Sequence, residues 1–228
     1  MRLSLTALLV LAAPLAAAQP DDASDATPLR EGARALLFQV GPDLDFGSLA
    51  GSVLSYKWHQ SPTQARRIGV SGFLDVSVGD EEQTSDGGES GRTTNSQQGS
   101  VSLSLVSLTY RRGDTPVVLY HGVGPTVSGF VGRNESDTGS ADDTFAQGTI
   151  RTSFEVRAGV AGVLGVEWPV ADAISLVGEY GVSLTGSYRL DRLTQTSRPD
   201  GGESALSSDR FGLQFDPSGA RLGVSVYF

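Results

Sequence analysis

The chain has 228 residues, the length of a single domain, and 39% of them are hydrophobic. Outside its first 18 residues it has no run of about 20 apolar residues, which excludes a helical membrane protein. It has no cysteine, which excludes a disulfide framework and a thiol nucleophile. Two histidines and one methionine disfavour a transition-metal site, so we expect no metal and no cofactor.

Residues 1–18 have the features of a secretory signal peptide. Arg2 supplies a positive charge, Leu3–Ala13 form an apolar core, and Ala16–Ala18 provide a small-residue cleavage site. The remaining chain has 16 basic and 26 acidic residues, a net charge of −10, which excludes a nucleic-acid-binding protein. Gln19–Ala33 follow as a polar lead-in with two prolines and four acidic residues, which we expect to be mobile.

From Arg34 onward, apolar and polar residues alternate with a period of two, the pattern of β-strands that have one apolar face. The alternation predicts eight strands, at about Arg34–Val40, Gly47–His59, Ala65–Val78, Gly99–Tyr110, Val117–Val131, Ile150–Trp168, Ile174–Leu190 and a last strand that ends at Phe228. The parity of the apolar residues flips near Val106–Ser107, where we expect a β-bulge.

The connections between these strands alternate in length. Those after the second, fourth and sixth strands are tight, whereas long polar segments without periodicity follow the third, fifth and seventh, at Gly79–Gln98, Arg133–Thr149 and Asp191–Asp209. We expect these segments to be loops. Together with Gly41–Phe46 they carry a net charge of −11, so the acidity gathers on one rim. Such a rim either attracts divalent cations and cationic ligands or is simply solvated.

The chain ends on a short motif. Arg221, Gly223, Val226 and Phe228 have the spacing polar-x-Gly-x-x-hydrophobic-x-aromatic. This motif resembles the terminal β-signal of bacterial outer-membrane β-barrel proteins. The resemblance implies recognition by the barrel-assembly machinery and closure of the last strand onto the first.

Beyond this motif the resemblance is one of architecture. An even number of strands, with tight turns at one end and long connections at the other, is the wiring of an up-and-down outer-membrane barrel. We therefore predict an all-β, closed, antiparallel, up-and-down transmembrane β-barrel of eight strands. The chain from Arg34 to Phe228 resembles the small outer-membrane barrels typified by the membrane domain of OmpA. The resemblance implies location in the cell outer membrane, contact with outer-membrane lipids and lipopolysaccharide, both termini in the periplasm, and acidic loops outside the cell.

Alternation alone does not separate a membrane barrel from a soluble barrel or a secreted β-sandwich. The predicted apolar faces carry no Lys, Arg, Asp or Glu through their middles, as a lipid-facing band requires. Aromatic residues beside the tight turns predict an interfacial girdle made of Tyr56, Trp58, Tyr110 and Trp168. Both features favour the membrane barrel.

The polar faces of the strands carry charges that we expect to point into the lumen. They are Arg67, Asp75, Glu155, Arg157, Glu179 and Arg189. An eight-stranded barrel is just wide enough for side chains to fill it, and buried charges must pair. We therefore interpret this cluster as a satisfied polar core. The alternative is a narrow ion path that opens when ion pairs rearrange.

Some eight-stranded barrels modify lipid A with a serine–histidine pair on the barrel wall. His121 has no serine two residues further on, and no base or orienting group can be named for a nucleophile. We predict that His121 is an interfacial residue and that His59, at a turn, is solvated. The sequence therefore predicts a protein without catalysis that contributes to envelope integrity or presents acidic loops to an unidentified external ligand. A narrow ion pore is the main alternative, and a lipid A-modifying enzyme is the least favoured.

Overall fold

The computed structural model describes residues 29–41, 51–85, 88–140, 146–198 and 202–228, which form an all-β fold. The strands are β1 (Arg34–Val40), β2 (Ser52–Ser61), β3 (Gln64–Ser85), β4 (Gly88–Arg111), β5 (Val118–Ser140), β6 (Ala146–Ala171), β7 (Ile174–Arg198) and β8 (Gly202–Tyr227). Each strand pairs antiparallel with its neighbours in the chain, and β1 also pairs with β8. The predicted closed, up-and-down barrel of eight strands is thereby confirmed. The part of the chain that the structure describes has no helix with the length and apolar character needed to span a membrane.

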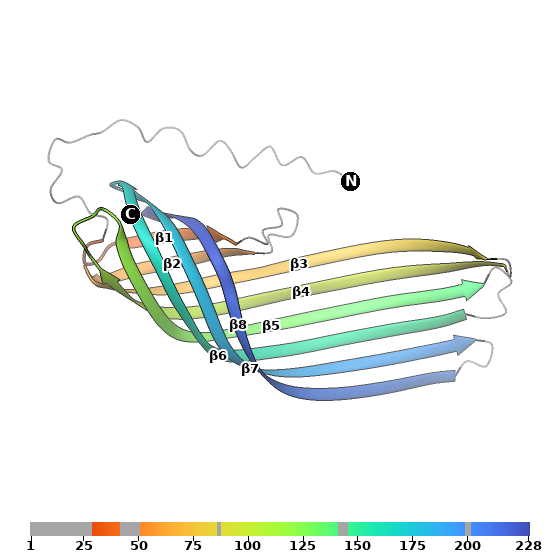
Figure 1. The fold of residues 1–228 in the computed structure, drawn as a ribbon. Coiled ribbons are helices and arrows are strands. Elements are labelled where there is room, and N and C mark those ends of the chain that lie inside the picture. Colours follow the sequence, from red (N-terminus) through yellow and green to blue (C-terminus); the bar gives the residue numbers. More distant parts are fainter. Residues whose placement is uncertain (1–28, 42–50, 86–87, 141–145, 199–201) are drawn as a thin grey trace.

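The barrel closes where the chain ends. β1 pairs with β8 over the six residues from Ala35 to Val40, and the amide of Phe228 donates to the carbonyl of Arg34 at 3.0 Å. The start of β1 and the end of β8 therefore lie at the same end of the barrel, which we call the terminal end (Figure 1). Two-residue turns join β2 to β3 and β6 to β7 at this end, as the sequence predicts. We call the opposite end the open end.

Six of the strands are much longer than a membrane requires. β3 to β8 have 22 to 26 residues, whereas about 9–11 residues suffice to cross a bilayer. Past the open end these strands continue as a curved sheet that β1 and β2 do not join (Figure 1). One row of cross-strand partners runs through all six strands, at Asp75, Gln98, Gly132, Ser153, Asp191 and Ser208. We call the residues from this row to the hairpin ends the extension, which comprises 75–85, 88–98, 132–140, 146–153, 191–198 and 202–208.

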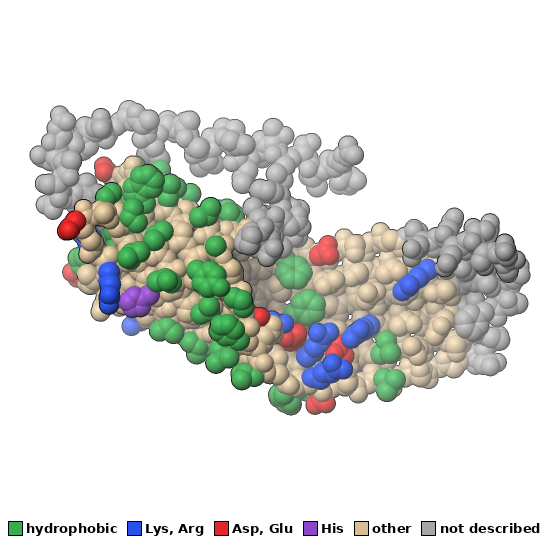
Figure 2. All heavy atoms as spheres, viewed as in Figure 1, with side chains coloured by type: hydrophobic (Ala, Val, Ile, Leu, Met, Phe, Trp, Pro, Cys, Tyr) green, Lys and Arg blue, Asp and Glu red, His purple; other side chains and the backbone are tan. Residues whose placement is uncertain are grey.

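The outer face of the barrel carries the apolar side chains. In β6, Leu164 is 63% exposed and Val160 is 51% exposed. The outward residues from Phe154 to Trp168 include no charge. At about 3.3 Å per residue and a tilt of about 45°, this stretch spans roughly 30 Å, the thickness of the hydrocarbon core. Figure 2 shows hydrophobic side chains spread over the barrel and charged ones gathered where it passes into the extension. Such an exposed apolar band is the surface that a membrane barrel presents to lipid.

The long polar segments are strands, and our expectation that they form loops is wrong. β3 continues to Ser85 and β4 begins at Gly88, and the other two hairpins are extended in the same way. The reason is that both faces of the extension lie outside the apolar band. Its residues are mostly polar on both sides, so no two-residue alternation marks the strands.

The expected β-bulge at Val106–Ser107 is also absent. β3 and β4 keep one register along their whole length. Val106, Leu108 and Tyr110 all point into the lumen, where they are buried. The apolar parity flips because the lumen itself becomes apolar toward the terminal end. The structure has a register shift in β8 instead, at Gly219, whose φ is +68°.

Candidate functional site in the barrel lumen

A buried ion pair crosses the lumen near the terminal end, between Lys57 in β2 and Glu167 in β6. Nζ of Lys57 lies 2.9 Å and 2.7 Å from the two carboxylate oxygens, and the two side chains are 2% and 0% exposed. The hydroxyls of Tyr227 and Tyr110 also donate to Glu167, at 2.6 Å and 3.2 Å. This carboxylate thus accepts four hydrogen bonds from three side chains, which compensates for its burial.

A second buried pair joins Arg67 in β3 to Glu179 in β7. The guanidinium donates to both carboxylate oxygens, at 2.5 Å and 3.0 Å, and the hydroxyl of Tyr120 donates to Glu179 at 2.9 Å. Bidentate arginine–carboxylate contacts of this kind are among the strongest hydrogen-bonded pairs in proteins.

Both pairs cross the barrel from wall to wall. In a ring of eight strands β2 lies opposite β6 and β3 lies opposite β7. Successive side chains of a β-strand point to opposite faces of the barrel wall. The chain neighbours of these four charged residues face outward, so the charged side chains point inward. An eight-stranded barrel is narrow enough for such side chains to meet at its centre. The two pairs therefore tie opposite walls of the lumen together.

An apolar plug closes the terminal end. Leu29, which precedes β1, is 1% exposed and belongs to the same buried cluster as the lumen-facing residues. Arg112 donates to the carbonyl of Leu29 at 2.6 Å, and the amide of Gly32 donates to the carbonyl of His59 at 3.0 Å. Residues 29–33 are thus held against the barrel, contrary to the mobile lead-in that we expected. The rest of the lead-in and the predicted signal peptide lie outside the described residues.

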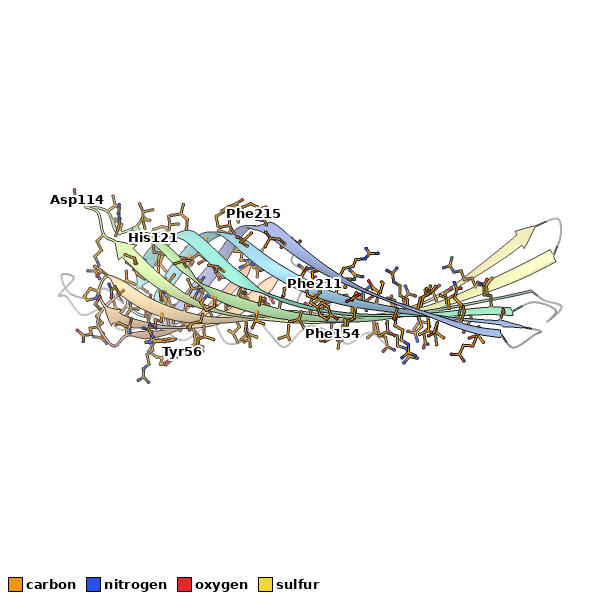
Figure 3. All side chains as sticks on the ribbon, turned by 90° about the horizontal axis from the view of Figure 1, so that it is seen from below. Tyr56, Asp114, His121, Phe154, Phe211 and Phe215 are labelled. Carbon is orange, nitrogen blue, oxygen red and sulfur yellow. The ribbon has the colours of Figure 1, made fainter. Side chains whose placement is uncertain are left out.

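The two histidines lie on opposite sides of the barrel wall. His59 is 2% exposed, with its ring 5.1 Å from that of Tyr110 and 6.0 Å from that of Tyr227. It is buried in the lumen, and our expectation that it is solvated is wrong. His121 is exposed on the outer face of β5 (Figure 3). Within the described ranges no three His, Cys, Asp or Glu side chains converge so as to hold a metal ion.

A cavity of about 150 Å³ lies between the Arg67–Glu179 pair and the open end. Gln39 and Ser55 line it and are almost completely buried. Both amide atoms of Gln39 and the hydroxyl of Ser55 have no hydrogen-bond partner among the described residues. Arg221 also lines the cavity. The middle of the barrel is therefore polar and hollow, whereas the terminal end is packed.

A partly exposed charge network surrounds the open end. Nε of Arg157 donates to Glu155 at 2.5 Å, and Nε of Arg189 donates to Asp191 at 2.9 Å. A second guanidinium nitrogen of Arg189 lies 3.9 Å from Glu155. These four residues link β6 to β7 on the lumen side, beside the start of the extension.

The structure divides the six predicted lumen charges into three groups. Arg67 and Glu179 meet inside the barrel, and Glu155, Arg157 and Arg189 meet at the open end. Asp75 lies apart from both groups, exposed in the extension and without an ion pair among the described residues. The predicted cluster did not include Lys57 and Glu167. Their inward parity, on strands that lie opposite each other in the ring, was a signal that both side chains enter the lumen, although parity alone does not show that they meet.

Three of the four predicted girdle residues lie on the outer surface near the terminal end. The rings of Tyr56 and Trp58 stack with their centroids 5.8 Å apart, and Trp168 is 48% exposed. Tyr110 is not part of a girdle, because it is buried in the lumen and donates to Glu167. A second group of outward aromatic residues, which we did not predict, lies where the barrel passes into the extension. It includes Phe154 and Phe211 (Figure 3), and the ring centroid of Tyr188 lies 4.7 Å from that of Phe211.

The residues of the predicted assembly signal lie along the closing seam. Val226 and Phe228 face outward, and Arg221 and Gly223 face the lumen. Gly223 is the cross-strand partner of Gln39, and a Cβ atom at this position would lie 2.7 Å from Cγ of Gln39. The glycine therefore gives Gln39 the room to extend along the lumen wall.

Three of the solved structures that match the chain are those of outer membrane proteins. A major outer membrane protein from Thermus thermophilus is 19% identical, with 87% of this chain and 100% of that chain covered and a TM-score of 0.43. CarO from Acinetobacter baumannii is 13% identical, with 87% and 98% covered and a TM-score of 0.37. The outer membrane protease OmpT from Escherichia coli is 7% identical, with 87% and 94% covered and a TM-score of 0.29.

No curated protein matches the chain. At the level of sequence families, the model of the outer membrane protein beta-barrel domain matches residues 3–228, nearly the whole chain. The chain belongs to this outer membrane protein family, and its place in the cell is the outer membrane.

Proposed function

We propose that this protein is a closed, non-catalytic barrel that anchors a six-stranded sheet on the cell surface. The observation that carries the proposal is the length of β3 to β8, which continue well past the apolar band. In β6 the distance from Phe154 to Ala146 is about 25 Å at 3.3 Å per residue. Such a sheet holds its polar side chains in fixed positions, which suits a role in envelope integrity or in contacts with external molecules.

The packing of the lumen supports a barrel that does not conduct. Two ion pairs cross the lumen, and the apolar plug that includes Leu29 lies between them and the terminal end. An ion that crossed the barrel would have to displace both layers. Because a buried pair that loses one partner costs about 3–5 kcal/mol, spontaneous opening of either layer is rare.

The orientation of the barrel can be tested by cysteine labelling, since the chain has no cysteine of its own. In Thr196→Cys the thiol lies in the extension, and in Asp114→Cys it lies in the connection at the terminal end (Figure 3). Intact cells treated with a membrane-impermeant maleimide should label the first variant and leave the second unlabelled. Permeabilised cells should label both. Labelling of Asp114→Cys alone in intact cells would reverse the orientation and refute surface display.

Surface display also predicts that the extension can be removed without loss of the barrel. The three hairpins can be cut at the paired residues Ser77–Ser96, Arg133–Thr152 and Asp191–Ser208 and closed with Asn-Gly turns. The trimmed protein should still insert into lipid and run differently on a gel with and without boiling. Cells that carry it should have the envelope defects of cells that lack the protein. Normal resistance of such cells to detergents and large antibiotics would refute a role for the extension.

A narrow ion pore is the second candidate. It is favoured by the cavity, which lies between the Arg67–Glu179 pair and the open end. Planar-bilayer recordings of the inserted protein distinguish the two functions. No conductance is expected for the closed barrel. Discrete and reproducible conductance steps whose size changes in the Arg67→Gln variant would establish the pore instead.

A further inference from the structure

The cavity in the middle of the barrel contains polar groups that no neighbouring side chain satisfies. Gln39 is 1% exposed and Ser55 is 2% exposed, yet the side-chain amide of Gln39 and the hydroxyl of Ser55 make no hydrogen bond to any residue that the structure describes. Buried polar groups are nearly always hydrogen-bonded, because leaving one unpaired costs about 1–3 kcal/mol. A polar occupant of the cavity would complete these contacts.

The cavity also carries an excess of positive charge. Three charged residues line it, Arg67, Glu179 and Arg221. Glu179 is already occupied by the bidentate contact from Arg67 and by the hydroxyl of Tyr120. Arg221 is the cross-strand partner of Glu179, but no carboxylate of the described residues lies within ion-pairing distance of its guanidinium. A half-buried guanidinium without an ion pair favours an anion beside it.

Part of the cavity lining is apolar. Val53, Val106 and Val163 contribute inward side chains from β2, β4 and β6. A volume of about 150 Å³ equals that of an engineered protein cavity large enough for benzene. The cavity therefore has room for a molecule of about six non-hydrogen atoms that is charged at one end and apolar at the other.

We propose that this cavity is a binding site for a small monocarboxylate that enters from the open end. The carboxylate lies against Arg221 and accepts from the amide nitrogen of Gln39, and the hydrocarbon part lies against the valines. Water alone would satisfy Gln39 and Ser55 but would leave the charge of Arg221 without a counterion. This binding role is separate from surface display and does not require conduction.

The test uses the full-length protein, folded in detergent micelles and labelled with ¹⁵N, with sodium butyrate as the probe. Butyrate should cause saturable shifts of the amide resonances of cavity-lining residues, with a dissociation constant on the order of 1 mM. Butyramide, which has the same shape without the charge, should cause no saturable shifts. Sodium chloride keeps the ionic strength constant throughout. Absence of saturation by butyrate, or equal binding of butyramide, would overturn the proposal and leave a merely hydrated cavity.

Two variants locate the site. Gln39→Leu keeps the volume and removes the amide, so it should weaken butyrate binding about tenfold. Gln97→Leu, on the exposed outer face of the extension, is the matched control and should leave the affinity unchanged. Arg221→Gln should weaken binding by at least tenfold. Arg221 belongs to the terminal motif, so the Arg221→Gln variant can fail to assemble. In that case the butyrate affinity of Gln39→Leu alone tests the site. An unchanged affinity in folded Gln39→Leu would refute the site.

Discussion

Removing either partner of the Lys57–Glu167 pair should destabilise the barrel strongly and unequally. Glu167→Leu leaves the ammonium of Lys57 buried without an acceptor and also removes the acceptor of two tyrosine hydroxyls. Lys57→Met leaves a carboxylate that still accepts from Tyr110 and Tyr227. Breaking a buried pair costs about 3–5 kcal/mol. We expect Lys57→Met near the lower limit and Glu167→Leu near the upper one.

The double variant, which carries both Lys57→Met and Glu167→Leu, separates the cost of losing the whole ion pair from the cost of leaving one charge buried alone. When both charges are replaced by apolar residues of similar volume, neither is left buried alone, and the free energy of unfolding is often unchanged or even higher. Two tyrosine hydroxyls lose their acceptor, each at about 1 kcal/mol. The double variant should therefore unfold within about 2 kcal/mol of the original protein, far from the sum of the single changes.

The assay is reversible urea unfolding of the protein in phospholipid vesicles, followed by the fluorescence of Trp58 and Trp168, which lie on the outer surface near the terminal end. Arg133→Met is the control, because its pair with Glu135 lies in the extension with side chains 55% and 33% exposed. Such a pair should contribute less than about 1 kcal/mol. If each single lumen change costs no more than the control, or if the two costs add in the double variant, the reasoning about the lumen is refuted.

Two further substitutions test the outer face and the seam. Val160→Arg places a charge in the middle of the apolar band and should lower the unfolding free energy in lipid by about 2–4 kcal/mol. Gln97→Arg in the extension is the control and should leave the unfolding free energy unchanged. If both variants lower it equally, the apolar band does not lie at Val160. Gly223→Leu should prevent closure of β8 onto β1, because its Cβ atom would clash with the backbone at Phe38, and should therefore abolish heat-modifiable gel mobility. Gly129→Leu, where a Cβ atom meets nothing within 4 Å, should fold, and folding of both variants would contradict the seam geometry.

The part of the fold that the sequence could predict is the part that touches lipid. Lipid requires an apolar side chain at every second position, and this requirement imposes a period of two on β6 from Phe154 to Trp168. Water on both faces imposes no such period, so the strands of the extension were interpreted as loops. Serine, threonine and glycine next to acidic residues are typical of loops, and the pairing of Ser77 with Ser96 is visible only in the structure.

Local parity was also insufficient at Tyr110. The sequence shows that Val106, Leu108 and Tyr110 share a face, and an apolar face was interpreted as a lipid face. In the structure the same parity leads into the apolar part of the lumen. What the sequence does not provide is the stagger of the strands around the ring, which sets the depth of each residue in the barrel. Parity gives the direction of Glu167, whereas only the stagger brings it level with Lys57.

Because the segments of the extension are strands and not loops, their acidic residues can oppose pairing at the open edges of a sheet. Beyond the barrel, the described part of β3 pairs only with β4 and that of β8 only with β7, so the extension has two open edges. An open edge is a template for pairing with another chain, and charged side chains oppose such pairing. Glu203 lies exposed on the edge strand β8, and Asp75 lies exposed on the edge strand β3. Like charges on both edges repel when two copies approach side by side. The acidity that the sequence places on one rim therefore also opposes edge-to-edge pairing between copies of this open sheet.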